Sequence, residues 1–451
     1  MAVSILLINI FAATLALFSI LNKKELLASG KLSGLIISFF SVISLIAFVY
    51  FISVITGMNE IIFLSVITLC PVCFIIFSGT DFFKLFKTDF LQILNKRAIV
   101  VLLLIFVSSY IFTGFSQRWG AGWDAFAIWD MHAKFLIFEN SWRNYLTNTI
   151  AWSHPDYPLM LSSYIAMFWR CMGSAQPIVP AIIAYIVFLA IPLSAYSSFK
   201  SNKFETGGIL FFILVCVNYN FISRAASQYA DSLLGLFYLL PLMMMYFSNN
   251  KNADIFFLAG FFAALCGWIK NEGLLYFFAF SFYVIVANFR NVTAIKKYIL
   301  GSLIPLVMIF IFKSFYAPAN DLAAIYSSES FYKLMDAERY KTIIVFFCNI
   351  IVSDHFFLLP VIIILIFFQR SYFKSFGFKV TITVLAGYFL IYLLTPLDLN
   401  WHLESSFTRL FHQLYPSFLY SMIAAFRVYE SPLNRQVENV EKKYRTWIEN
   451  G

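Results

Sequence analysis

Long apolar runs recur from one end of this sequence to the other, and they limit what the chain can fold into. A helix needs about 20 mostly apolar residues to cross the hydrocarbon core of a bilayer. Hydrophobic residues make up 61% of the chain and charged residues 12%, whereas a soluble globular chain has about 45–50% and about 25%. The sequence therefore predicts an all-α fold, a polytopic transmembrane helical bundle.

The apolar runs define about 13 expected spans. They lie near residues 3–21, 32–56, 61–78, 98–115, 177–199, 206–223, 229–247, 254–269, 272–289, 296–316, 355–369, 379–396 and 408–427. The run 158–172 is treated differently, because its roughly 15 residues extend only about 22 Å as a helix. It ends in Trp169 and Arg170, so we expect an interfacial helix there.

The net charge of +9 has a simpler explanation than a nucleic-acid partner, because cytoplasmic loops carry excess Lys and Arg. No Lys or Arg precedes the first run, and Lys23 and Lys24 follow it. We therefore expect a retained first helix with the N-terminus outside. The basic linker 79–97 then lies inside. If 158–172 does not cross, every later basic loop and the tail 428–451 also lie inside.

The stretch 116–158 is a polar loop on the outer side in this topology. It holds four carboxylates and five tryptophans, and tryptophan favours the headgroup level of a membrane. The histidines also fall on or near the outer side. They are His132, His154, His355, His402 and His412. A polar site at the outer face is the expected consequence.

Asp124 and Asp130 lie beside tryptophans in this loop. Six residues apart, they would occupy different faces of a helix, so we expect different roles. Packing by Trp123 and Trp129 would orient a carboxylate and exclude water, which raises its basicity. A general base is one interpretation, and a solvated interfacial loop is the other.

The segment His154-Pro155-Asp156-Tyr157-Pro158 ends the loop. Its two prolines fix an extended turn, in which the imidazole and the Asp156 carboxylate can point the same way. A phosphate or metal contact is one interpretation, and simple entry into a helix is the other. Two ligands are too few for us to expect a metal site.

Two more polar groups lie at outer ends of expected spans. Asp231 opens one span, where the helix dipole alone would stabilise it. Lys270 and Glu272 lie between two spans. They are either a surface ion pair or, if the lysine faces a cavity in the bundle, a clamp for a phosphate.

The last polar group contains Trp401-His402-Leu403-Glu404 and, further on, Arg409 and Gln413. Arg409 and Gln413 are four residues apart and share a helix face. An arginine in the first turn of a span is costly unless it is paired or bound to an anion.

The order of these groups resembles the GT-C superfamily of polytopic glycosyltransferases, which includes protein O-mannosyltransferases and the lipid A aminoarabinose transferases of bacteria. The resemblance covers roughly residues 116–425. It consists of the loop aspartate, the His-Pro and Tyr-Pro entry and the aspartate after Tyr-Ala. Lys-Asn-Glu-Gly between spans and Trp-His-Leu, Arg-Leu and Gln-Leu-x-Pro near the end complete it.

The resemblance implies roles for particular residues. Asp124 would take the proton of the acceptor, and Asp231 would be a second acidic position lining the site. Lys270 and Arg409 would hold the donor phosphate. The rest of the expected substrate-binding set is His154, Asp156, Glu272 and His402. No cofactor is implied with certainty, and a divalent cation stays an alternative.

The implied activity is transfer of a sugar from a polyprenyl-phosphate donor to a hydroxyl of a glycan, lipid or protein acceptor. It would take place among membrane lipids at the outer face of the cytoplasmic (inner) membrane. One base and no second nucleophile suggest inversion. A lipid-linked glycan ligase or polymerase is the nearest alternative. A transporter fits less well, because the spans carry few charges.

The expected organisation follows from the same resemblance. Residues 98–427 would form the catalytic module, with outer loops at 116–176 and 317–353. Family members usually have one span before the catalytic loop, whereas four precede it here. Residues 1–97 are therefore expected to be extra N-terminal helices, and 428–451 a cytoplasmic tail.

Overall fold

The computed structural model describes residues 1–24, 30–78, 96–119, 122–138, 142–247, 252–319, 332–354 and 370–429. Every regular element in these residues is a helix, which confirms the predicted all-α class. Four predicted features lie wholly or partly outside the described residues. They are the span 355–369, most of the linker 79–97, the middle of the loop 317–353 and most of the tail 428–451.

Six helices in the described part of the chain are long and apolar enough to cross a membrane. They are α1 (Ala2–Lys23), α2 (Lys31–Thr56), α5 (Lys96–Trp119), α8 (Ile178–Ser201), α14 (Val292–Phe315) and α18 (Phe376–Leu394). Four further helices contribute shorter apolar stretches, of 10–17 residues, within the described part of the chain. They are α3 (Glu60–Ser78), α11 (Ala230–Phe247), α12 (Asp254–Ile269) and α13 (Glu272–Ala287). The chain thus has multi-pass helical character, and the total of 13 spans stays a prediction.

The expected span 206–223 is bent. Helices α9 (Glu205–Cys216) and α10 (Tyr219–Ala226) meet at 66°. The Asn218 side chain caps α10 by accepting a hydrogen bond from the backbone N–H of Phe221. Asparagine competes for local backbone groups in this way and favours a helix start over a helix interior. This segment is therefore a broken span or a re-entrant turn.

Helix α7 (Met160–Met172) occupies the run expected to be interfacial. Its 13 residues extend about 20 Å, short of the roughly 30 Å hydrocarbon core. Most of its side chains are buried, and it packs on α1, α2, α8 and the short helix α6 (Met131–Leu136). The helix is thus too short to span, and its position relative to the membrane surface stays a prediction.

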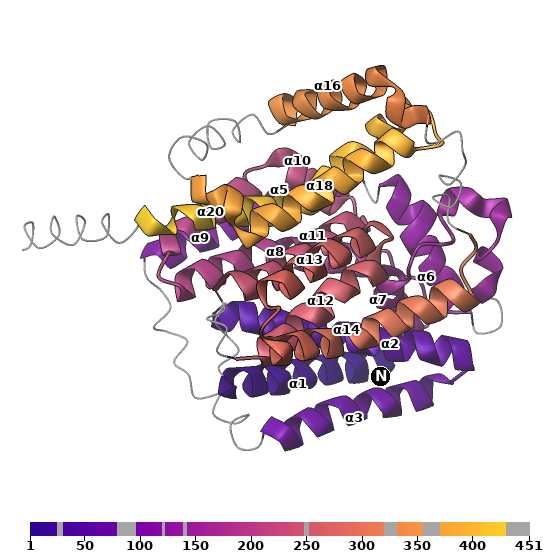
Figure 1. The fold of residues 1–451 in the computed structure, drawn as a ribbon. Helices are drawn as coiled ribbons and strands as arrows, with labels where there is room; N and C mark the ends of the chain where they lie inside the picture. Colours follow the sequence, from indigo (N-terminus) through magenta and orange to yellow (C-terminus); the bar gives the residue numbers. More distant parts are fainter. Residues whose placement is uncertain are drawn as a thin grey trace, which may run out of the picture.

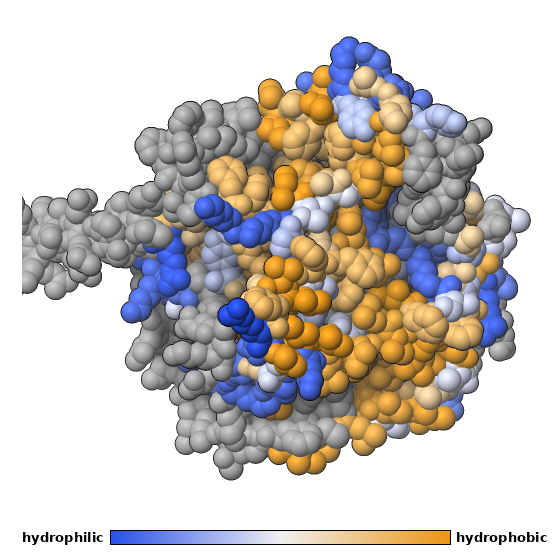
Figure 2. Space-filling model, viewed as in Figure 1, coloured by the Kyte–Doolittle hydropathy of each residue, from blue (hydrophilic) through white to orange (hydrophobic). Residues whose placement is uncertain are grey.

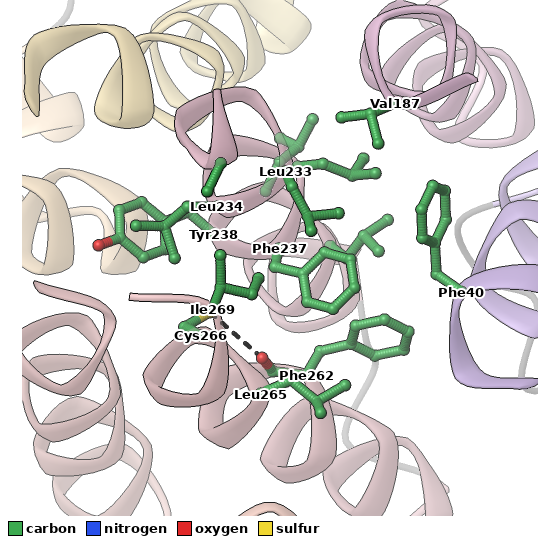
Figure 3. Packing of buried hydrophobic residues seen from close by; sticks show 14 of the residues in the cluster. Phe40, Val187, Leu233, Leu234, Phe237, Tyr238, Phe262, Leu265, Cys266 and Ile269 are labelled. Atoms are coloured by element: carbon green, nitrogen blue, oxygen red, sulfur yellow. Dashed lines mark hydrogen bonds between the residues drawn. The ribbon is translucent and has the colours of Figure 1, made fainter. Parts of the chain in front are cut away.

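Helices α11 and α12 lie at the centre of the bundle (Figure 1). Figure 3 shows their side chains, among them Phe237 and Phe262, meeting Phe40 of α2 and Val187 of α8. Helix α12 also packs so closely on α14 that a Cβ at Gly260 would overlap the Tyr298 carbonyl. Small residues allow such close approach of helices in membranes.

The visible surface is apolar over the middle of the molecule, and hydrophilic residues gather toward the two ends of the helices (Figure 2). Large apolar side chains are exposed on the described helices, including Phe106 of α5 and Phe310 of α14. An apolar belt of this kind faces lipid readily and water poorly.

The described segment 332–354 contains α16 (Ala337–Asp354). The last described segment, 370–429, also contains α19 (Leu399–His402), the π-helical turn η9 (Leu403–Phe407) and α20 (Thr408–Ala425). In the loop 116–158, the π-helical turn η3 (Ala125–Asp130) leads into α6. Irregular helical turns of this type often occur at functional sites. Asp124 directly precedes η3, and Arg409 lies two residues after η9. The charged side chains of these two residues meet across the bundle.

Candidate functional site

Arg409, in the first turn of α20, joins two carboxylates from distant parts of the chain. Its Nη2 donates a hydrogen bond of 2.5 Å to Oδ2 of Asp124, and its Nε donates one of 3.2 Å to Oδ2 of Asp231. The guanidinium also lies 5.1 Å from the ring centre of Tyr229. The sequence argument that Arg409 needs an anionic partner is confirmed, and two aspartates supply it.

Asp231, in the first turn of α11, is the centre of the network. Its Oδ1 accepts hydrogen bonds from Nζ of Lys270 at 3.0 Å and from Nε2 of Gln413 at 2.5 Å, in addition to the bond from Arg409. The residue is 3% exposed. Three donors around one buried carboxylate hold it as a structural acceptor, as a buried charge requires.

Lys270 is enclosed between two carboxylates. It lies just after α12 in extended backbone and is 2% exposed. Its Nζ contacts Oδ1 of Asp231 at 3.0 Å and Oε1 of Glu272 at 3.1 Å. Burial lowers the pKa of the ammonium, but the charges of Asp231 and Glu272 outweigh this and hold the pKa above its usual value. Lys270 is therefore charged and is held by both carboxylates.

The turn that carries Lys270 depends on a glycine. A Cβ added at Gly273 would overlap the carbonyl oxygen of Cys266 on the preceding turn. The backbone N–H of Gly273 also donates a hydrogen bond of 3.0 Å to the carbonyl of Lys270. The sequence Lys-Asn-Glu-Gly thus folds into a tight connection between α12 and α13, which presents its three polar side chains close together.

Asp156 forms a neighbouring group with two residues. Its Oδ2 accepts a hydrogen bond of 2.7 Å from Nδ2 of Asn271 and lies 3.4 Å from Nζ of Lys313. Lys313 also donates a 2.5 Å bond to the Asp156 backbone carbonyl. Lys313 was not among the predicted residues. The signal was available, because a lysine near the end of a membrane span marks a site unless it reaches the interface.

Tyr157 lies among these charges, and its role was also not predicted. Burial raises the pKa of its phenol well above the usual value, and the nearby carboxylates of Glu272, Asp156 and Asp124 raise it further. Nζ of Lys270 lies 5.7 Å from the centre of its ring. The ring therefore connects the Asp156 group with the Asp231 network.

The two predicted histidines lie at the edge of this region. Nδ1 of His402 is 2.9 Å from Oγ1 of Thr395. Burial lowers the pKa of His402, although the charge of Glu272 acts in the opposite direction. His154 has a positive φ of 50° and stacks on Tyr157, with ring centres 4.7 Å apart.

Asp130 lies apart from these ion pairs, as expected for a carboxylate with a different role. Burial raises its pKa to about 6, and the charge of Lys134 lowers it. Its Oδ1 is buried and accepts no hydrogen bond within the described part of the chain.

The network as a whole contains four carboxylates and three cations, which leaves one formal negative charge. The members are Asp124, Asp156, Asp231, Glu272, Lys270, Lys313 and Arg409. Within the described residues, no three His, Cys, Asp or Glu side chains lie close enough to hold a metal ion. A divalent cation at a phosphate therefore stays a prediction.

Two atoms of the network remain open within the described residues. Oδ1 of Asp124 accepts no hydrogen bond, and Nη1 of Arg409 donates none. Their side chains are 14% and 21% exposed. The arrangement can therefore accept a proton at Oδ1 of Asp124 and bind an anionic oxygen at Nη1 of Arg409 while the hydrogen bond between Nη2 and Oδ2 stays in place.

The structure thus brings together five of the eight predicted residues in one chain of ion pairs, Asp124–Arg409–Asp231–Lys270–Glu272. Asp156, His154 and His402 lie around it. No family model, curated protein or solved structure matches this chain.

Proposed function

We propose that this chain is a membrane glycosyltransferase that moves a sugar from a polyprenyl-phosphate donor to an acceptor hydroxyl. The observation that carries the proposal is the placement of Arg409 and Asp124. Nη2 of the guanidinium and Oδ2 of the carboxylate lie 2.5 Å apart. Nη1 and Oδ1 of the same two groups stay open within the described residues. Transfer of a sugar from a phosphate needs one group that stabilises the departing phosphate and one that takes the proton of the acceptor hydroxyl.

Arg409 and Asp124 account for the leaving group and for the proton in this transfer. The acceptor oxygen attacks the anomeric carbon of the sugar and forms the new C–O bond, while the bond between that carbon and the phosphate oxygen breaks. The phosphate leaves with the electron pair, and Nη1 of Arg409 stabilises its charge. The acceptor proton passes to Oδ1 of Asp124. Attack opposite to the leaving group inverts the anomeric configuration.

Lys270 contributes indirectly in this proposal. Its ammonium is 2% exposed and lies between two carboxylates, so a donor phosphate would reach it only by displacing one of them. Lys270 instead holds Asp231, and Asp231 orients the guanidinium of Arg409. Preorganised charges of this kind stabilise a transition state without reorganising during the reaction.

The position of the charges favours an enzyme over a transporter. Asp231, Glu272 and Arg409 all lie in the first turn of a helix, and Lys270 follows the end of one. Transporter sites usually lie near the bilayer midplane. An apolar hollow of about 180 Å³ between α16 and α18 also reaches Phe407, two residues before Arg409. A lipid chain fits such a surface.

The test uses the full chain purified into lipid nanodiscs. Undecaprenyl phosphosugars carrying glucose, mannose, N-acetylglucosamine or aminoarabinose are supplied with an envelope extract from cells that lack the gene. Release of undecaprenyl phosphate is followed by mass spectrometry. We expect release with at least one donor, and a loss of about 10- to 150-fold in donor affinity for Arg409→Met, the size of a charge-assisted contact.

The matched control is Arg290→Met, because Arg290 is an exposed arginine outside the network. Lipid and glycan profiles of cells with and without the gene would identify the acceptor. Unchanged donor affinity in Arg409→Met, or transfer of a whole oligosaccharide from a diphosphate carrier, would contradict the proposal. The second result would favour a ligase or polymerase.

A further inference from the structure

Two acceptor oxygens in the turn between α12 and α13 lack a donor, although the groups around them are paired. Within the described residues, Oδ1 of Asn271 and Oε2 of Glu272 are buried and accept no hydrogen bond. The other end of each side chain is occupied. Nδ2 of Asn271 donates to Asp156, and Oε1 of Glu272 contacts Lys270.

Such atoms are rare in folded proteins and need an explanation. A buried acceptor without a donor is destabilising, and more so when it carries charge. The two side chains cannot turn to other partners without giving up the contacts to Asp156 and Lys270. The turn itself is fixed, because Gly273 packs against the carbonyl of Cys266. Donors that arrive with a ligand would satisfy both oxygens.

The surroundings of Glu272 indicate what kind of ligand would fit. Its Oε1 lies 3.1 Å from Nζ of Lys270, and the same Nζ lies 5.7 Å from the centre of the Tyr157 ring. The neighbouring Asn271 contacts Asp156, in the loop that ends at Pro158. Lys270 separates it from Asp231 and Arg409. Glu272 therefore occupies the end of the chain of ion pairs that Lys270 and Asp231 separate from Arg409, and the Tyr157 ring lies close to that lysine.

We infer that Asn271 and Glu272 recognise the hydroxyl groups of the sugar ring, with Oδ1 of Asn271 and Oε2 of Glu272 each accepting a hydroxyl hydrogen. The inference rests on the proposed function, because the sugar is carried by the phosphate that Arg409 holds. The ligand class is a polyhydroxylated ring attached to a lipid phosphate. Undecaprenyl phosphate alone lacks the donors that these oxygens need.

The experiment compares two lipids on the full chain in nanodiscs, with binding measured by quenching of tryptophan fluorescence. One is undecaprenyl phosphate, and the other is the same lipid carrying each sugar of the panel above. The measured quantity is the ratio of the two dissociation constants. In the wild type we expect at least one sugar to improve binding about 10-fold or more, as hydrogen bonds to a charged group do.

Glu272→Gln replaces one carboxylate oxygen by an amide NH₂ of the same shape. We expect it to bring the ratio close to one. The ratio is the quantity compared, because loss of the Glu272 charge beside Lys270 also acts on the affinity for undecaprenyl phosphate itself. Glu272→Asp keeps the negative charge on a side chain that is one methylene shorter. It is measured in place of Glu272→Gln if that variant fails to fold. Glu338→Gln is the matched control, because Glu338 is exposed and paired only with Lys341 in the described chain.

The outcomes separate this inference from the proposed function. A wild-type ratio near one for every sugar, or a ratio that both Glu272 variants leave unchanged, overturns the recognition role and leaves the phosphate site standing. Absence of binding of either lipid to the wild type overturns the proposed function, and the inference falls with it.

Discussion

Replacing Asp231 by asparagine should destabilise the folded chain strongly. Asp231 accepts hydrogen bonds from Lys270, Arg409 and Gln413, and both ion-paired partners are largely buried. Asparagine keeps one acceptor oxygen but places an NH₂ against a donor. It also leaves Lys270 with Glu272 as its remaining carboxylate contact in the described chain.

The expected size follows from the burial of the pair. Lys270 and Asp231 are 2% and 4% exposed in their side chains, and removing one partner of such a pair costs about 3–5 kcal/mol. The Lys341–Glu338 pair is 69% and 78% exposed, and exposed pairs contribute about 0–1 kcal/mol. Asp231→Asn and Glu338→Gln should therefore differ by at least about 2 kcal/mol in their effect on the free energy of unfolding.

The assay is reversible unfolding of the purified chain in mixed micelles by titration with SDS, followed by circular dichroism. The double variant Asp231→Asn with Lys270→Met should cost less than the sum of the single variants, by about 0.5–3 kcal/mol. The reasoning fails if Asp231→Asn costs less than about 1 kcal/mol, or if the double variant shows full additivity. Either result would mean that the ion pairs of Asp231 do not stabilise the folded chain.

Three further predictions concern the loop and the topology. Asp124→Asn should lower turnover by about 10²–10⁴, as loss of a general base does, with donor binding nearly intact; an equal or larger loss in Asp130→Asn would place the base elsewhere. The folded chain holds the Asp130 pKa near 6, above about 3.9 for an unfolded chain. Its stabilising contribution is therefore complete below pH about 4 and lost as the pH rises through 6. The Asp130→Asn variant should be thermally more stable than the wild type at pH 8 but not at pH 4. The same difference in melting temperature at both pH values would refute this. A single cysteine at the exposed Ser174 should react with an impermeant maleimide added outside, while one at Ser201 should be protected; reaction of Ser201 from outside would overturn the whole topology.

The sequence was sufficient to predict most of the helical segments and the multi-pass helical character of the chain, but it did not predict α16 (Ala337–Asp354) in the expected outer loop 317–353. Both follow from local properties, because an apolar run in lipid must satisfy its backbone hydrogen bonds within the segment. The sequence also placed Asp231, Glu272 and Arg409 at helix starts, since charges are costly deeper in a span. It did not predict the bend at Asn218, whose side chain caps the start of α10 where the chain turns away from α9.

The pairing of the charges was decided by the tertiary structure. Asp124 and Arg409 are 285 residues apart, and Lys313 and Asp156 are 157 apart. No spacing rule connects such positions. Arg409 could have been left open for a phosphate or matched by protein carboxylates, and both fit the same pattern of residues. The outcome depends on which helix ends pack side by side, because an ion pair forms only within about 4 Å and a buried charge must find its partner there.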